Sequence, residues 1–145
     1  MSAAPKRAVG PVAFIAVSSV FLFAGLAIAK DSVTVNLTGG EETPPVTTSA
    51  SGKGKITVSS KDHTVKGSIK TTGIEGTMAH IHVGAPGKAG PPIVTLTKGA
   101  DGTWTVPPGT KLTDDQYESF TSGNLYVNVH SADHASGELR AQLKP

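Results

Sequence analysis

The chain has 145 residues, a length that suits one globular domain. It contains no cysteine, which excludes disulfides, thiolate metal sites and cysteine nucleophiles. The formal charge is +2 at pH 7, from 13 basic and 11 acidic residues. A small exported domain of this composition has to rely on its apolar core or on a bound ligand.

The first 29 residues are typical of a secretory signal peptide. Lys6 and Arg7 precede an uncharged apolar stretch, residues 8–29, which ends in the small-x-small pattern Ala27-Ile28-Ala29. We therefore expect residues 1–29 to be removed and residues 30–145 to form one extracytoplasmic domain, periplasmic or secreted, with no membrane attachment. The alternative is an uncleaved anchor, because the apolar stretch is long enough to span a bilayer. Without Lys6 and Arg7, eleven basic residues balance eleven acidic ones, so no charge excess favours nucleic-acid binding.

From residue 30 onward, short β-type segments alternate with turns rich in Gly, Pro, Ser and Thr. Pro44 and Pro45 prevent the first segment from continuing, and the loop at 84–92 suits neither a helix nor a central strand. The expected strands are residues 32–38, 55–59, 63–70, 78–83, 93–97, 103–106, 124–131 and 137–143.

One short helix interrupts this pattern. Thr113-Asp114-Asp115-Gln116 has the form of a capping box, and Gly123 suits a helix end. The sequence therefore predicts an all-β fold: an antiparallel Greek-key sandwich or barrel of about eight strands, with one helix closing an end of the sheets.

Histidines stand out on two of the expected strands. Because side chains alternate between the faces of a strand, Met78, His80 and His82 share a polar face opposite Ala79, Ile81 and Val83. His130 lies in the same way opposite Leu125, Val127 and Val129, and Leu139 and Leu143 extend the expected core.

This pattern favours a metal site. His80 and His82 are close enough for both imidazoles to reach one ion, and His130 supplies a third nitrogen. His134 is a candidate fourth ligand, Asp133 a candidate group to orient an imidazole, and Met78 a candidate contact for copper(I). Imidazole suits copper and zinc, and copper(II) heads the stability order, so copper is the expected cofactor. The alternative is that these histidines only keep a solvated strand face polar, as we expect for His63 at a hairpin turn.

The chain resembles the CHRD domain family, named after chordin. The matching segments run in the family's order, and Ala141 departs from the family's usual glycine. They are residues 37–46 (LTGGEETPPV), 79–84 (AHIHVG), 90–94 (GPPIV), 125–131 (LYVNVHS) and 137–143 (GELRAQL). This resemblance implies the fold and a site more than a specific activity.

A second resemblance is to copper-zinc superoxide dismutase, an eight-stranded Greek-key protein whose copper is held by a His-x-His pair and further histidines beside an arginine. It implies a ligand role for His80, His82 and His130, and a catalytic role for Arg140 only if the chemistry is dismutase-like. The chain lacks the zinc histidine cluster and the cysteines of that family, so only a copper-only version is carried over.

Two hypotheses follow. The first is an exported protein with a surface histidine site that binds copper, with superoxide dismutase-like activity as the enzymatic version. The second is a non-catalytic extracytoplasmic module that binds a protein or a polymer through its loops. The residues alone do not decide whether the protein is an enzyme.

Overall fold

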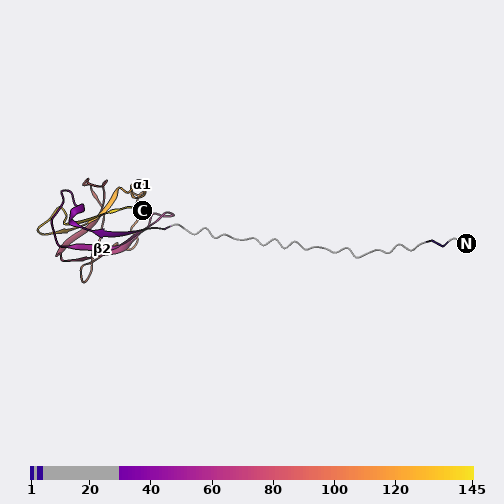
Figure 1. The fold of residues 1–145 in the computed structure, drawn as a ribbon, viewed down its shortest axis with the longest axis horizontal. Helices are drawn as coiled ribbons and strands as arrows, with labels where there is room; N and C mark the ends of the chain where they lie inside the picture. The colour runs from indigo at the N-terminus through magenta and orange to yellow at the C-terminus, as the bar shows by residue number, and fades with distance from the viewer. Residues whose placement is uncertain (2, 5–29) are drawn as a thin grey trace.

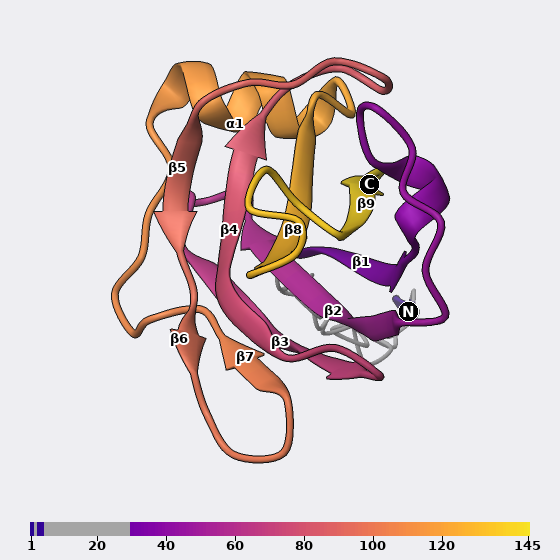
Figure 2. The same ribbon diagram turned by 90° about the vertical axis from the view of Figure 1, so that its left-hand side faces the viewer.

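The structure is a computed structural model that describes residues 1, 3, 4 and 30–145. Two antiparallel sheets face each other across an apolar core (Figures 1 and 2). One sheet has the order β1 (Lys30–Leu37), β2 (Ser51–Ser59), β3 (Val65–Thr72), β7 (Thr103–Thr105) and β6 (Thr97–Lys98). The other has the order β5 (Pro92–Thr95), β4 (Gly76–Val83), β8 (Leu125–Ser131) and β9 (Leu139–Leu143). No helix among the described residues is long and apolar enough to cross a membrane.

The predicted all-β sandwich is confirmed, whereas a closed barrel is not formed. The pairing of β3 with β7 and of β4 with β8 joins strands that are not consecutive, as expected of Greek-key connections. The described part has nine strands rather than about eight, because the segment expected as one strand at 93–97 divides into β5 and β6. These two strands belong to different sheets, and Leu96 between them is buried in the core.

Strand alternation places the core as expected. Leu139 and the alternating apolar residues of β4 and β8 are at most 1% exposed, while Val83 is partly buried against them. Helix α1 (Asp114–Thr121) lies across one end of the sheets (Figure 2) and inserts the buried Phe120. Its capping box is formed as predicted: Gln116 N donates to Thr113 Oγ1, and Thr113 N donates to Gln116 Oε1.

The outer face of the four-stranded sheet is covered by loops. All seven residues of β8 are buried, although only alternate ones face the core. The short 3₁₀ helix η1 (Gly39–Glu41) belongs to the loop that follows β1, and Glu42 just after it contacts Asn128 on this face. Figure 2 shows the β8–β9 loop crossing in front of β8. The face predicted to be solvated is therefore largely enclosed.

Candidate metal centre

Strand register brings the predicted histidines together. In the pairing of β4 with β8, Met78 lies opposite His130, His80 opposite Asn128, and His82 opposite Tyr126. Directly paired residues in a sheet project to the same face, so three histidines from two strands share one small area. The register of β4 against β8 thus brings residues that are far apart in the sequence into one site.

The three imidazoles form a group with the geometry of a metal site. His80, His82 and His130 each offer one ligand nitrogen, and these nitrogens lie within 4.8 Å of one another. His80 Nδ1 and His130 Nε2 are already 3.0 Å apart. Two nitrogens bound to one ion at about 2.0–2.1 Å lie roughly 3.3 Å apart in tetrahedral geometry, so this pair already has about the spacing that one ion requires. These three histidines could hold a metal ion.

Backbone carbonyls orient two of the rings. His82 Nδ1 lies 2.8 Å from the carbonyl oxygen of Gly90, and His130 Nδ1 lies 2.9 Å from that of Ala135. Because a carbonyl oxygen only accepts, both Nδ1 atoms carry the proton, and in the neutral rings both Nε2 atoms have a free lone pair. His80 Nδ1 then donates to His130 Nε2. This is the arrangement by which proteins fix the tautomer of metal-binding histidines.

Burial favours the neutral form of two of the three rings. It lowers the pKa of His80 and of His82, and in His80 the neighbouring His130 and His82 lower the pKa further. The hydrogen bond to Gly90 opposes the shift in His82. His82 Nε2 is buried and has no hydrogen-bond partner among the described residues. Asn128 also raises the pKa of His82, and this ring nitrogen could serve as a metal ligand.

A stack of side chains lies against His82. The Tyr126 ring lies parallel to that of His82 with centroids 4.8 Å apart, and the Arg140 guanidinium carbon lies 3.5 Å from the Tyr126 centroid on the same sheet face. The Tyr126 hydroxyl accepts from Gly90 N at 3.2 Å, which places the carbonyl that orients His82. A Cβ at Gly90 would overlap the Val83 carbonyl oxygen, so this close approach requires glycine.

Arg140 lies where the sequence placed it, on the polar face next to the histidine strand, but it is only 1% exposed. Its guanidinium donates at 3.0 Å to the carbonyl oxygens of Lys88 and Ala85 and to Gln142 Oε1. It thereby fastens the loop at 84–91 to β9. Its burial gives it a structural role, and a catalytic role stays a prediction.

The expectation of a surface site is wrong in one respect. His82 and His130 are each 7% exposed, and only His80 is partly open to solvent, because loops cover the sheet face. His134 is outside the three-histidine group, so its ligand role stays a prediction, and Asp133 is exposed while carbonyls orient the rings. His63 is also more than a surface residue: it stacks on Tyr117 at 4.1 Å and lies 3.4 Å from Asp114.

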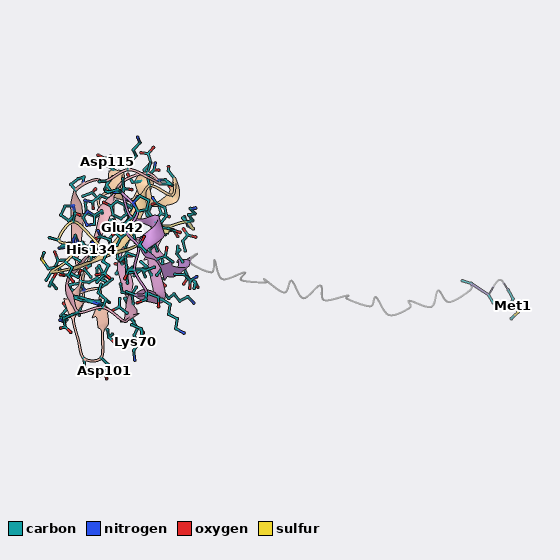
Figure 3. The ribbon with its side chains drawn as sticks, turned by 60° about the vertical axis from the view of Figure 1, so that its left-hand side comes forward. Met1, Glu42, Lys70, Asp101, Asp115 and His134 are labelled. Carbon is teal, nitrogen blue, oxygen red and sulfur yellow. The ribbon has the colours of Figure 1, made fainter. Side chains whose placement is uncertain are left out.

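Sequence reasoning did not assign roles to several buried polar groups around the site. Asn128 donates to Glu42 at 3.4 Å, and burial raises the pKa of Glu42. Glu138 accepts from Ser131 at 2.6 Å and from Thr48, and these bonds lower its pKa. Figure 3 shows Glu42 and His134 in the middle of the domain, between Asp115 at one end and Asp101 at the other. The sequence signal that could have indicated these buried groups was the presence of Tyr126 and Asn128 on the polar face of the expected strand.

The comparison with family models agrees with this architecture, because the model of the CHRD domain matches residues 33–143. The chain belongs to the CHRD domain family. The match includes β2 to β9, most of β1 and all three clustered histidines, so the histidine group is part of the CHRD domain itself.

Neither the curated proteins nor the solved structures contain a match to this CHRD protein. The comparisons therefore give no support to the resemblance to copper-zinc superoxide dismutase.

Proposed function

We propose that this CHRD protein binds copper outside the cytoplasm through His80, His82 and His130. The supporting observation is the convergence of three imidazole nitrogens with two Nδ1 atoms already committed to backbone carbonyls. The lone pair of His82 Nε2 is then free, and that of His130 Nε2 accepts from His80 Nδ1. An ion would take the place of that hydrogen bond, and an enclosed set of neutral ring nitrogens suits a cation.

The ligand type favours copper over other first-row metals. The group contains imidazoles alone, without carboxylates that would favour magnesium, calcium or manganese. Copper(II) exceeds zinc in affinity for such nitrogen ligands, and zinc is the main competitor. The N-terminal sequence and membership of the CHRD family support export, with cleavage after Ala29 as the expected processing step. N-terminal sequencing of the exported protein tests that step, and an intact Met1 in the membrane fraction would indicate an anchor instead.

Superoxide dismutation is the enzymatic form of this proposal. It requires a copper ion that cycles between two oxidation states and is accessible to the anion, for which the partly open His80 provides the approach. Arg140 would then act as a buried cation behind Tyr126 rather than at a surface entrance. Activity has to follow copper content for this version to hold.

Metal analysis of histidine variants tests the proposal. The full chain is exported, stripped with chelator and titrated with copper or zinc, and bound metal is measured with superoxide loss. His82→Gln and His130→Gln should each lower copper affinity on the order of tenfold or more, because each removes one of three nitrogens. His63→Gln is the matched control, since this histidine lies outside the group, and His134→Gln tests the optional fourth ligand. Equal copper binding by the parent and His82→Gln would overturn the proposal.

A second candidate function rests on the outer face of the five-stranded sheet. Lys53, Lys55, Lys66 and Lys70 project from β2 and β3, and none of them forms an ion pair within the described part of the chain. Lys53 lies directly opposite Lys70, an arrangement of like charges that destabilises a sheet. Both line a shallow hollow of about 570 Å³ that also includes Asn36, Ser51 and Thr72. This face would suit an extracytoplasmic acidic polysaccharide.

Binding to immobilised dextran sulfate, with neutral dextran as the blank, measures this second function. The double variant Lys53→Gln/Lys70→Gln should bind more weakly than the parent, while the exposed pair Lys88→Gln/Lys144→Gln serves as a charge-matched control. The interaction should also weaken as salt rises, because exposed charges are screened. Equal losses in both double variants would mean that net charge alone, rather than this face, attracts the polymer.

A further inference from the structure

An exposed methionine adjoins the histidine group. Met78 is 49% exposed, and the only other large apolar side chain that is exposed among the described residues is Met1. Every other large apolar residue of the described domain is buried or partly buried, so Met78 does not serve the core. An isolated exposed thioether beside three imidazoles calls for a chemical explanation.

Register places this methionine within reach of the site. Met78 is the direct partner of His130 across β4 and β8, and it precedes His80 by two residues on the same face. Side chains in such pairs have Cβ atoms about 4.5–5.5 Å apart. The methionine side chain is unbranched and flexible, so its sulfur can turn toward the ion position without movement of the backbone.

Met78 and His80 are the most exposed residues of this group. The stack of Tyr126 and Arg140 covers one face of His82, and the carbonyls of Gly90 and Ala135 hold the two buried rings. Of the three histidines, only His80, the neighbour of Met78, is partly exposed. An ion that arrives from solvent would therefore meet the exposed Met78 and His80 before the buried His82 and His130.

The chemistry of this entrance is selective. Thioether sulfur is a soft ligand that favours copper(I), whereas zinc(II) prefers nitrogen, thiolate or oxygen. The chain has no cysteine, so Met78 supplies the one sulfur ligand of residues 30–145. The ligand set is also uncharged, and the Arg140 cation lies over the Tyr126 ring, which in turn stacks on His82. A fixed cation this close to the site repels a divalent ion more strongly than a monovalent one.

We propose that Met78 is the fourth ligand of this centre, and that it makes the site selective for copper(I) and receives the ion at the entrance. This rests on the proposed function, because it requires the three histidines to bind metal. It adds the oxidation state of the ion, the direction of entry and a ligand that lies outside the histidine group.

Met78→Leu provides the test, since leucine removes the sulfur but keeps an apolar side chain of similar volume at an exposed position. The full chain and the variant are titrated anaerobically with copper(I) against a chromophoric chelator, and separately with zinc(II). We expect the variant to lose copper(I) affinity on the order of tenfold, which corresponds to about 1.4 kcal/mol, with zinc affinity unchanged within about threefold. X-ray absorption of the copper(I)-loaded parent should show a sulfur scatterer that is absent from the variant.

The outcomes separate the two proposals. Equal copper(I) affinity in parent and Met78→Leu, with nitrogen scatterers only, would overturn the role of Met78 and leave the histidine centre in place. A loss of zinc and copper(I) binding together in the variant would also contradict selectivity. If the parent binds neither copper nor zinc, the histidine centre itself is refuted and the role of Met78 falls with it.

Discussion

Replacing Arg140 by methionine should destabilise the metal-free protein strongly. The guanidinium donates to two loop carbonyls, those of Lys88 and Ala85, and stacks on Tyr126 at 3.5 Å. Both carbonyls belong to a partly exposed loop where water replaces some of the lost bond, so each accounts for about 1 kcal/mol. A desolvated cation–π contact contributes about 2 kcal/mol, of which a methionine sulfur on Tyr126 restores up to about 1 kcal/mol. The expected loss is therefore about 3 kcal/mol.

Urea unfolding in the presence of chelator measures this loss. With a slope of about 1.5 kcal/mol per molar urea, the midpoint should fall by about 2 M. Arg140→Lys should lose less stability than Arg140→Met, because an ammonium keeps the charge. It should still be less stable than the parent, because an ammonium cannot donate to both carbonyls from a rigid fork. The exposed Lys144→Met removes the same charge and should stay within about 0.5 kcal/mol of the parent. An Arg140→Met protein within 1 kcal/mol of the parent, at unchanged slope, would refute the view that Arg140 fastens the loop.

Three further predictions concern pH and the helix. The pKa values of His80 and His82 are lowered in the fold, so the unfolded chain takes up protons at higher pH than the folded one. The free energy of unfolding of the metal-free protein should therefore decline as pH falls below 6.5. In the double variant His80→Gln/His82→Gln, the urea midpoint should depend less on pH across this range. Burial raises the pKa of Glu42, so the contribution of Glu42 to stability is complete below pH 4.5 and is lost as pH rises. Glu42→Gln keeps an acceptor for Asn128, so it should be more stable than the parent at pH 8 but not at pH 4 in the same assay. Thr113→Ala removes a helix cap and should lower the free energy of unfolding by about 1 kcal/mol without changing metal affinity, and an unchanged midpoint would contradict the capping role.

Local sequence was sufficient for most of the fold. Strict alternation made the core faces of β4 and β8 readable, and the capping box at Thr113 identified the start of α1. The strand expected at 93–97 was misjudged because its apolar pattern is continuous through Leu96. The chain passes from one sheet to the other at this buried residue. That change depends on which strands are available for pairing, and the spacing of apolar residues does not encode it.

The candidate site was predictable as residues on a face, but not as an enclosed volume. Placing His80 and His82 opposite Asn128 and Tyr126 requires the register of two strands more than forty residues apart in sequence. The loops that cover this face are held by contacts between residues still farther apart in the sequence, such as the hydrogen bond from Asn128 to Glu42. Such contacts are set by the whole fold. Loops without periodicity give no signal of the face on which they will lie, so the histidines were expected to be solvated.

The enclosure itself argues that this face is functional. His82 Nε2 and Asn128 Oδ1 are buried without a hydrogen-bond partner in the described chain, and each such atom costs about 1–3 kcal/mol. A face that only had to stabilise the sandwich would be more stable with apolar side chains at both positions, as on the opposite face of β8. Backbone carbonyls meanwhile hold His82 and His130 with their lone pairs directed inward. The domain has no disulfides, yet it keeps these destabilising unpaired atoms together with the ordered rings. This combination is expected where binding of a cation recovers the stability that the empty site loses.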